Sequence, residues 1–202
     1  MTASVLVSLL AKGGPVMVPL GACSVLSLAV IIERAGFWWR ARSGGDAERA
    51  LHLAAAGKWD DAVEEGRASR APAARVLAAG LEHREAAPTL AMEAAARAEL
   101  ARMRRWLPVL DTIVTLSPLL GLLGTVTGMI AAFGVLSTSG ISQPHAITGG
   151  VAEALIATAT GLAVAIGTLV PYNYFSARAE RGLDEIERQG TRLELLLRGE
   201  PR

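Results

Sequence analysis

Two stretches of the chain are almost free of charged residues. The first, residues 13–32, has none in twenty positions, and the second, residues 106–177, has only Asp111 and Glu153 in seventy-two. A bilayer core about 30 Å thick is crossed by about twenty apolar helical residues, so the first stretch fits one crossing. The second is too long for one crossing, and polar, turn-forming residues at 137–145 interrupt it. The pattern therefore predicts three transmembrane helices.

These boundaries divide the chain into seven predicted segments. They are a periplasmic N-terminus at 1–12, a first transmembrane helix at 13–36, a cytoplasmic helical loop at 37–105, a second transmembrane helix at 106–136, a periplasmic loop at 137–147, a third transmembrane helix at 148–175, and a cytoplasmic helical tail at 176–202. The predicted fold is an all-α integral membrane protein whose long helices extend into the cytoplasm.

The orientation follows from the positive residues, which stay on the cytoplasmic side of a membrane. Residues 33–105 hold thirteen of the twenty Lys and Arg, residues 178–202 hold six, and the loop 137–147 holds none. The aromatic residues at 37–39, 106 and 172–175 all fall at the predicted inner boundary, where such side chains gather. The N-terminus is therefore expected outside and the C-terminus inside.

The overall composition excludes several classes of protein. A single cysteine forms no internal disulfide, and one cysteine with three scattered histidines builds no zinc cage. A net charge of +1 gives no excess of positive charge of the kind that binds nucleic acid. We find no nucleophile–base set and no phosphate-binding loop, so we expect neither an enzyme nor a cofactor.

The first apolar stretch has one alternative interpretation. This part of the chain resembles a lipoprotein signal in which Cys23 carries the lipid, because it contains Lys12, an apolar run and Leu20-Gly-Ala-Cys23. The apolar run, however, continues for nine residues beyond Cys23 and contains two prolines before it. These features favour a membrane helix in which Cys23 is simply a small residue.

The cytoplasmic loop is rich in Ala, Glu and Arg and lacks strand-like alternation, which predicts helices. Gly57, Gly66, Pro72 and Pro88 divide it, and we expect a helical hairpin rather than a repeat array. From about residue 89 good helix formers run on into the second apolar stretch, which predicts one continuous rod. The tail has a heptad seam, which predicts packing against the cytoplasmic helices or neighbouring subunits. The seam consists of Leu183, Ile186, Gly190, Leu193 and Leu197.

The second transmembrane helix carries Gly121, Gly124 and Gly128, and the last two form a GxxxG pattern. Glycines allow another helix to approach closely, so we expect tight helix packing here. Pro118 removes one helix hydrogen bond and permits a kink. The third helix is also dominated by small residues.

Three polar side chains are predicted inside the membrane. A carboxylate at membrane depth costs about 3 kcal/mol or more, so Glu153 is expected to face a protein or water-filled interior. Thr125 and Thr158 lie at similar depth, where their hydroxyls line one polar path or bond across an interface. Each has a structural alternative. Membrane threonines often bond to their own helix, and Glu153 in the first turns of a helix is favoured by the helix dipole.

Each predicted transmembrane helix carries a motif. In chain order these are Gly14-Pro-Val-Met-Val-Pro19 with Ile31-Ile-Glu-Arg34, Pro118-Leu-Leu-Gly-Leu-Leu-Gly-Thr-Val-Thr-Gly128, and Ala152-Glu-Ala-Leu-Ile-Ala-Thr-Ala-Thr-Gly-Leu-Ala-Val-Ala-Ile166 followed by Tyr172-Asn-Tyr-Phe175. Together they resemble the MotA/TolQ/ExbB proton-channel family, most closely its ExbB/TolQ branch. One departure is Ile166-Gly167, where many members have Ile-Pro; this chain has Pro171 instead.

The resemblance implies a homopentamer in the bacterial inner membrane whose second and third helices line a lumen. It implies a partner of the ExbD/TolR type, a single-span protein whose transmembrane Asp carries the proton. It also matches Thr125, Glu153 and Thr158 to the family's lumen-facing polar positions. The expected function is a proton-conducting energiser subunit that drives work across the envelope, such as Ton- or Tol-like import or envelope maintenance. The alternative is a structural membrane scaffold that holds a partner and conducts nothing.

Overall fold

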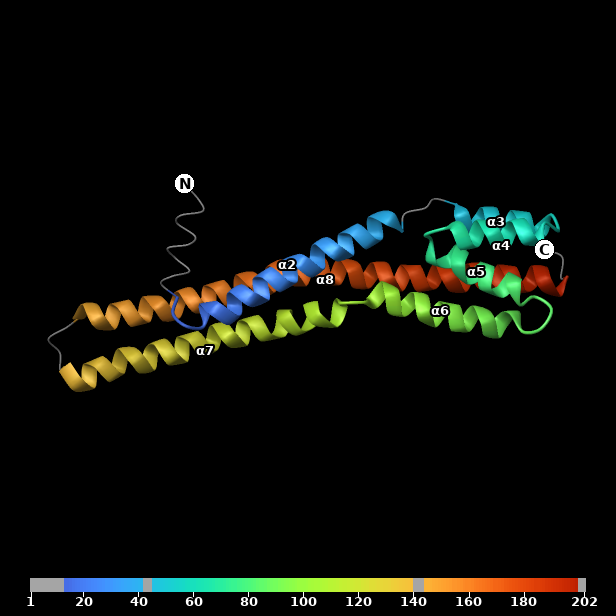
Figure 1. The fold of residues 1–202 in the computed structure, drawn as a ribbon. Helices are drawn as coiled ribbons and strands as arrows, with labels where there is room; N and C mark the ends of the chain where they lie inside the picture. The colour runs from blue at the N-terminus through green and yellow to red at the C-terminus, as the bar shows by residue number, and fades with distance from the viewer. Residues whose placement is uncertain (1–12, 42–44, 140–143, 200–202) are drawn as a thin grey trace. The chain divides into compact units, whose positions relative to one another are not determined.

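The computed structural model describes residues 13–41, 45–139 and 144–199, and within these ranges the regular structure is helical, without a strand (Figure 1). The helices are α2 (Met17–Arg40), α3 (Asp46–Ala55), α4 (Trp59–Ala68), α5 (Pro72–Glu82), α6 (Pro88–Arg104), α7 (Leu107–Ser139) and α8 (Pro144–Arg198). The predicted all-α fold is confirmed. The predicted N-terminus 1–12 and the centre of the predicted loop, residues 140–143, lie outside the described residues.

Three helical stretches among the described residues are long and apolar enough to cross a membrane. They are Met17–Arg40, Pro88–Gly134 and Thr148–Arg198. Each includes one of the crossings predicted from the charge pattern. A long helix segment whose side chains are apolar on every side is typical of a membrane span, where the surroundings are apolar too. The chain is therefore a multi-pass membrane protein.

Contacts divide the chain into two compact units. One unit comprises Met1–Ile31 and Trp106–Asn173, and the other comprises Ile32–Arg105 and Tyr174–Arg202. The boundaries fall within one or two residues of where the sequence changes from apolar to charged, except near residue 174, where the change comes four residues later. We call the first the membrane unit and the second the charged unit.

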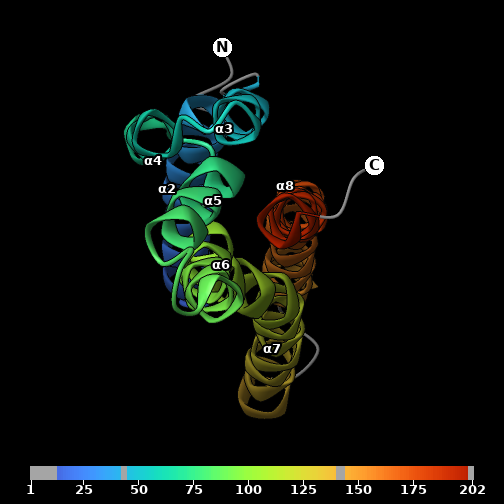
Figure 2. The same ribbon diagram turned by 90° about the vertical axis from the view of Figure 1, so that its right-hand side faces the viewer.

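In the charged unit, α3 to α6 pack in sequence order, each against the next (Figure 2). Gly57 has a φ of 75°, which glycine adopts without a steric penalty, and it reverses the chain between α3 and α4. Pro72 and Pro88 each occupy the first position of a helix, where a missing N–H costs nothing. The helices α3 and α4 form the expected hairpin.

Gly66 has a different role from the predicted one. It lies inside α4 rather than at its end. A Cβ on Gly66 would be 2.6 Å from the carbonyl oxygen of Ala74 and 2.9 Å from the Cβ of Ala78, both in α5. The glycine is therefore a site of close helix approach, and α4 continues to Ala68.

The predicted continuous rod from about residue 89 is wrong. The helix α6 ends at Arg104 and α7 begins at Leu107. Pro108 has no N–H to donate to the carbonyl of Arg104, and its ring would clash with that carbonyl in a continuous helix. Trp106 takes a φ of 68°, and its carbonyl accepts the first bond of α7, from the N–H of Val109 at 3.1 Å.

Arg34, in the charged-unit part of α2, stabilises the end of α6. Its guanidinium is 2% exposed and donates to the carbonyls of Arg102 at 2.9 Å and Met103 at 3.4 Å. It also pairs with Glu33 and lies 4.7 Å from the ring centre of Phe37. The last carbonyls of a helix lack intrahelical donors and carry partial negative charge, so a cation is favourable there.

We therefore expect Arg34→Met to lower the free energy of unfolding by about 3 kcal/mol, since it removes charged hydrogen bonds from buried carbonyls. SDS titration of the full chain, followed by circular dichroism, measures this loss. The control is Arg97→Met, because Arg97 is exposed and makes only a surface ion pair with Glu93. Equal losses in the two variants would contradict the role given to Arg34.

The tail seam packs against the other helices of the charged unit. Ile186 and Leu193 are buried, and a methyl carbon of Leu193 would lie 3.2 Å from a Cβ on Gly80 of α5. Of the two uses expected for the seam, contact with the helices of the 37–105 segment is the one observed within this chain. An ion pair 2.5 Å long between Arg192 and Glu48 ties α8 to α3. The hydrogen bond from Arg192 holds the pKa of the Glu48 carboxyl below its ordinary value.

Candidate functional site

The membrane unit is held together by a seam of small residues between α7 and the first part of α8. Gly121, Gly124 and Gly128 of α7 all face α8. A Cβ on Gly121 would lie 3.1 Å from the Cα of Thr158, and one on Gly128 would lie 3.0 Å from the Cβ of Ala154. Because no side chain stands between them, the two backbones approach closely.

Apart from Thr158, the α8 side of the seam consists of residues that the sequence analysis did not single out. Gly150 faces Ala132, and Gly161 faces Ser117 and Gly121. A Cβ on Gly161 would be 2.5 Å from the carbonyl oxygen of Ser117. The sequence does contain a signal for this packing face, because small residues of α8 recur at spacings of four, three and four. They are Gly150, Ala154, Ala157 and Gly161.

Pro118 lies inside α7, between Ser117 and Gly121 of the seam, and α7 continues through it as one helix. The neighbouring Ser117 is fully buried, and its hydroxyl has no hydrogen-bond partner among the described residues. The carbonyl of Ser117 is the group that meets Gly161. Pro118 therefore directly follows the residue whose carbonyl lies closest to Gly161 of α8.

The two threonines differ in what they bond. The Thr158 hydroxyl donates across the seam to the carbonyl of Gly121, at 2.9 Å. The Thr125 hydroxyl donates to Leu122 of its own helix, at 2.6 Å. Within one chain the two hydroxyls do not bond each other. Thr125 instead lines a shallow apolar groove on α7, together with Val126, Met129, Ile130, Phe133 and Gly134.

Glu153 lies against the turn that precedes α2. A Cβ on Gly14 would collide with the Glu153 carboxylate, and Gly14 has a φ of 72°. Glycine is favoured at position 14 because of this φ, whereas the clash with the flexible end of the Glu153 side chain can be relieved by rotating that side chain. The Glu153 side chain is half-buried. The arrangement places a carboxylate of α8 beside the start of the first membrane helix.

We expect Thr158→Val to lower the free energy of unfolding by about 0.6 to 1 kcal/mol, the usual contribution of one interhelical hydrogen bond in a membrane protein. The matched control is Thr160→Val, because the Thr160 hydroxyl bonds only to Ile156 of its own helix, at 2.8 Å. The midpoint of SDS-induced unfolding measures both variants. If Thr160→Val loses as much as Thr158→Val, the cross-helix bond is not what stabilises the seam.

The seam has no grouping suited to a metal. Among the described residues there is no cluster of three or more His, Cys, Asp or Glu that could hold an ion. The polar groups of the membrane unit singled out from the sequence are instead a carboxylate and two hydroxyls, which can accept, donate or pass a proton.

Comparison with known proteins identifies a matching family model and several relatives of this chain. Residues 68–188 match the model of the MotA/TolQ/ExbB proton channel family. The chain is 37% identical to the ExbB-like 3 protein of Synechocystis sp. over 193 residues, which span 92% of each chain. It is 40% identical to the ExbB-like 1 protein of the same organism over 93% of this chain and 77% of the relative. It is also 42% identical over 100 residues to TolQ of the Tol-Pal system of Pseudomonas aeruginosa, which spans 46% of this chain and 43% of that protein.

Proposed function

Because this chain belongs to the MotA/TolQ/ExbB proton channel family, in its ExbB/TolQ branch, we propose that it is a proton-conducting energiser subunit. In this proposal it uses the proton motive force to drive work across the cell envelope. Its place is the bacterial inner membrane, with the N-terminus in the periplasm and the C-terminus in the cytoplasm. The concentration of Lys and Arg at 33–105 and 178–202 supports that orientation.

The observation that carries the proposal is the polar content of α7 and α8 in the membrane unit. Within residues 106–173, Glu153 is one of only two charged side chains, and it lies well inside α8. A carboxylate in a membrane helix is costly and is commonly part of an ion pathway. Thr125 and Thr158 add hydroxyls to the same pair of helices. We propose that these three groups border the proton path.

We further propose that the chain acts as a homopentamer around a partner. Three membrane helices are few for enclosing a channel within one chain, so a lumen lined by α7 and α8 calls for several copies. The partner is a single-span protein of the ExbD/TolR type whose transmembrane Asp carries the proton. Its gene is sought first in the neighbouring reading frame, as a short protein with one N-terminal membrane helix.

Proton flux into proteoliposomes tests this function. The chain is reconstituted with its partner in vesicles that contain a pH-sensitive dye, and a potassium gradient with valinomycin sets the membrane potential. We expect flux from the complex, none from the chain alone, and none when the partner's transmembrane Asp is replaced by Asn. A complex that assembles but conducts no more than empty vesicles would refute the proposal.

A second candidate, the non-conducting scaffold, is favoured by one observation. The Thr158 hydroxyl donates its proton across the α7–α8 seam, and Glu153 rests against Gly14, so both groups make structural contacts within a single chain. A scaffold predicts that the complex forms without flux and that charge at position 153 is dispensable. The same vesicle experiment therefore separates the two functions.

A further inference from the structure

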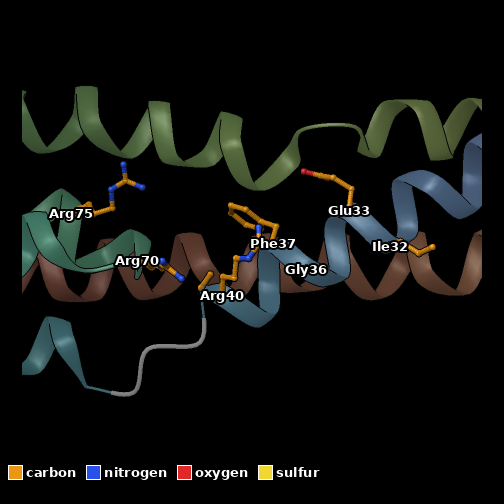
Figure 3. A pocket seen from close by; sticks show the side chains of 8 residues that line it. Ile32, Glu33, Gly36, Phe37, Arg40, Arg70 and Arg75 are labelled. Atoms are coloured by element: carbon orange, nitrogen blue, oxygen red, sulfur yellow. The ribbon is translucent and has the colours of Figure 1, made fainter.

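The charged unit contains a pocket that the proposed channel function does not use (Figure 3). It has a volume of about 550 Å³, within the range of small-molecule sites. Five of its lining residues belong to the end of α2 and the others to the residues that follow it, the α4–α5 connection and α5. They are Ile32, Glu33, Gly36, Phe37, Arg40, Ala41, Arg70 and Arg75.

The pocket has an excess of positive charge. Arg40 and Arg70 have no ion-pair or hydrogen-bond partner among the described residues, although both line the same cavity. The single acidic lining residue, Glu33, is already paired with Arg34 at 2.5 Å. Arg75 is paired more loosely with Glu99, at 3.4 Å. Two guanidinium groups are therefore available to an anion, and guanidinium is well suited to phosphate oxygens.

The other wall of the pocket is apolar and continues the membrane-spanning part of α2. Ile32 ends the uncharged stretch, and Phe37 presents its ring within the cavity lining. Trp39, two residues further, is 76% exposed, which is typical of the aromatic belt at a membrane surface. The helix thus passes from acyl-chain depth at Ile32 to headgroup depth at Arg40, about 12 Å further along the axis at the usual helical rise.

From this combination we propose that the pocket binds the phosphate of an anionic phospholipid. Arg40 and Arg70 contact the phosphate oxygens, and Ile32 and Phe37 contact the start of the acyl chains. Phosphatidylglycerol satisfies both halves of the site, whereas zwitterionic phosphatidylcholine carries a choline that the arginines repel. A free phosphate ion satisfies the arginines alone.

Native mass spectrometry of the full chain, titrated with phosphatidylglycerol in detergent, tests the site. Removing both charges with Arg40→Gln and Arg70→Gln is expected to weaken the retention of phosphatidylglycerol about thirtyfold, at about fivefold for each charge lost. Retention of phosphatidylcholine is expected to be low in both proteins. Equal retention of phosphatidylglycerol by the wild type and the double variant would overturn the proposal.

The matched control is the double variant Arg97→Gln and Arg188→Gln, which loses the same charge. Both residues are exposed, lie outside the pocket and make only ion pairs within their own helices. This variant is expected to retain phosphatidylglycerol as the wild type does. If it loses as much lipid as the pocket variant, the effect is one of net charge and the site does not exist.

A second measurement on the wild type applies even where the pocket variant fails to fold. Arginine modification by phenylglyoxal, read at each peptide, reports whether Arg40 and Arg70 are covered. We expect protection of both, relative to Arg97, in nanodiscs that contain phosphatidylglycerol and not in phosphatidylcholine alone. Absence of protection would overturn the proposal. Protection by inorganic phosphate in phosphatidylcholine nanodiscs, equal to that by phosphatidylglycerol, would show that the anion is soluble and would overturn the assignment to lipid.

Discussion

Replacing Glu153 with glutamine is expected to lower proton flux through the assembled complex about a hundredfold or more, the lower end of what a positioned proton-transfer group contributes. Glutamine has nearly the same shape as glutamate, so it fits beside Gly14 as the carboxylate does. It does not, however, accept and release a proton near neutral pH. Loss of flux without loss of assembly is therefore the signature expected of the proposed pathway.

The measurement is the same vesicle assay, with the complex purified beforehand and its subunit composition determined by native mass spectrometry. Asp111→Asn is the matched control, because it removes the other charge of the apolar region at an exposed position near the start of α7. Its flux is expected to remain within about twofold of the wild type, as for surface substitutions away from a site. Wild-type flux from Glu153→Gln would exclude a proton-relay role for this carboxylate and leave it the structural role beside Gly14.

Replacing Gly161 with alanine is expected to destabilise the membrane unit by about 2 kcal/mol or more, through overpacking. The added Cβ would lie 2.5 Å from the carbonyl oxygen of Ser117 and 3.0 Å from the Cα of Gly121. Both are backbone atoms, so no side chain can rotate away and α7 and α8 must separate. Separation also lengthens the bond from Thr158 to Gly121.

The matched control is Gly167→Ala, in the same helix. A Cβ on Gly167 meets nothing within 4 Å, so this change is expected to alter the free energy of unfolding by less than about 0.5 kcal/mol. SDS titration followed by circular dichroism compares the two. Similar stabilities for the two variants would show that the helices adjust around Gly161 and that the close approach is not required.

The seam shows how far sequence reasoning reaches. The spacing of Gly121, Gly124 and Gly128 predicted a face for close packing, because a period of three or four residues places them on one side of a helix. The same spacing recurs in α8 at Gly150, Ala154, Ala157 and Gly161. Periodicity identifies a face but not what covers it, so the pairing of these two faces had to come from the structure.

Two other features were not predicted, for different reasons. Pro108 is a visible signal for the break between α6 and α7, but the prediction of a continuous rod rested on the helix-forming residues before it and did not take this proline into account. The burial of Arg34 had no local signal at all. Its acceptor, the carbonyl of Arg102, lies 68 positions along the chain, and a charge that follows an apolar run ordinarily marks only the membrane surface.

The sequence by itself determined that the protein is helical and crosses a membrane three times, and it predicted the orientation. These properties follow from the distribution of apolar and charged residues along the chain, since each crossing depends on its own twenty or so residues. Only the tertiary structure decided that Thr158 bonds across the seam while Thr125 bonds within its own helix, that Glu153 lies beside Gly14, and that Arg40 and Arg70 share one pocket. These contacts join residues distant in the chain, and no pattern along one helix specifies what packs against it.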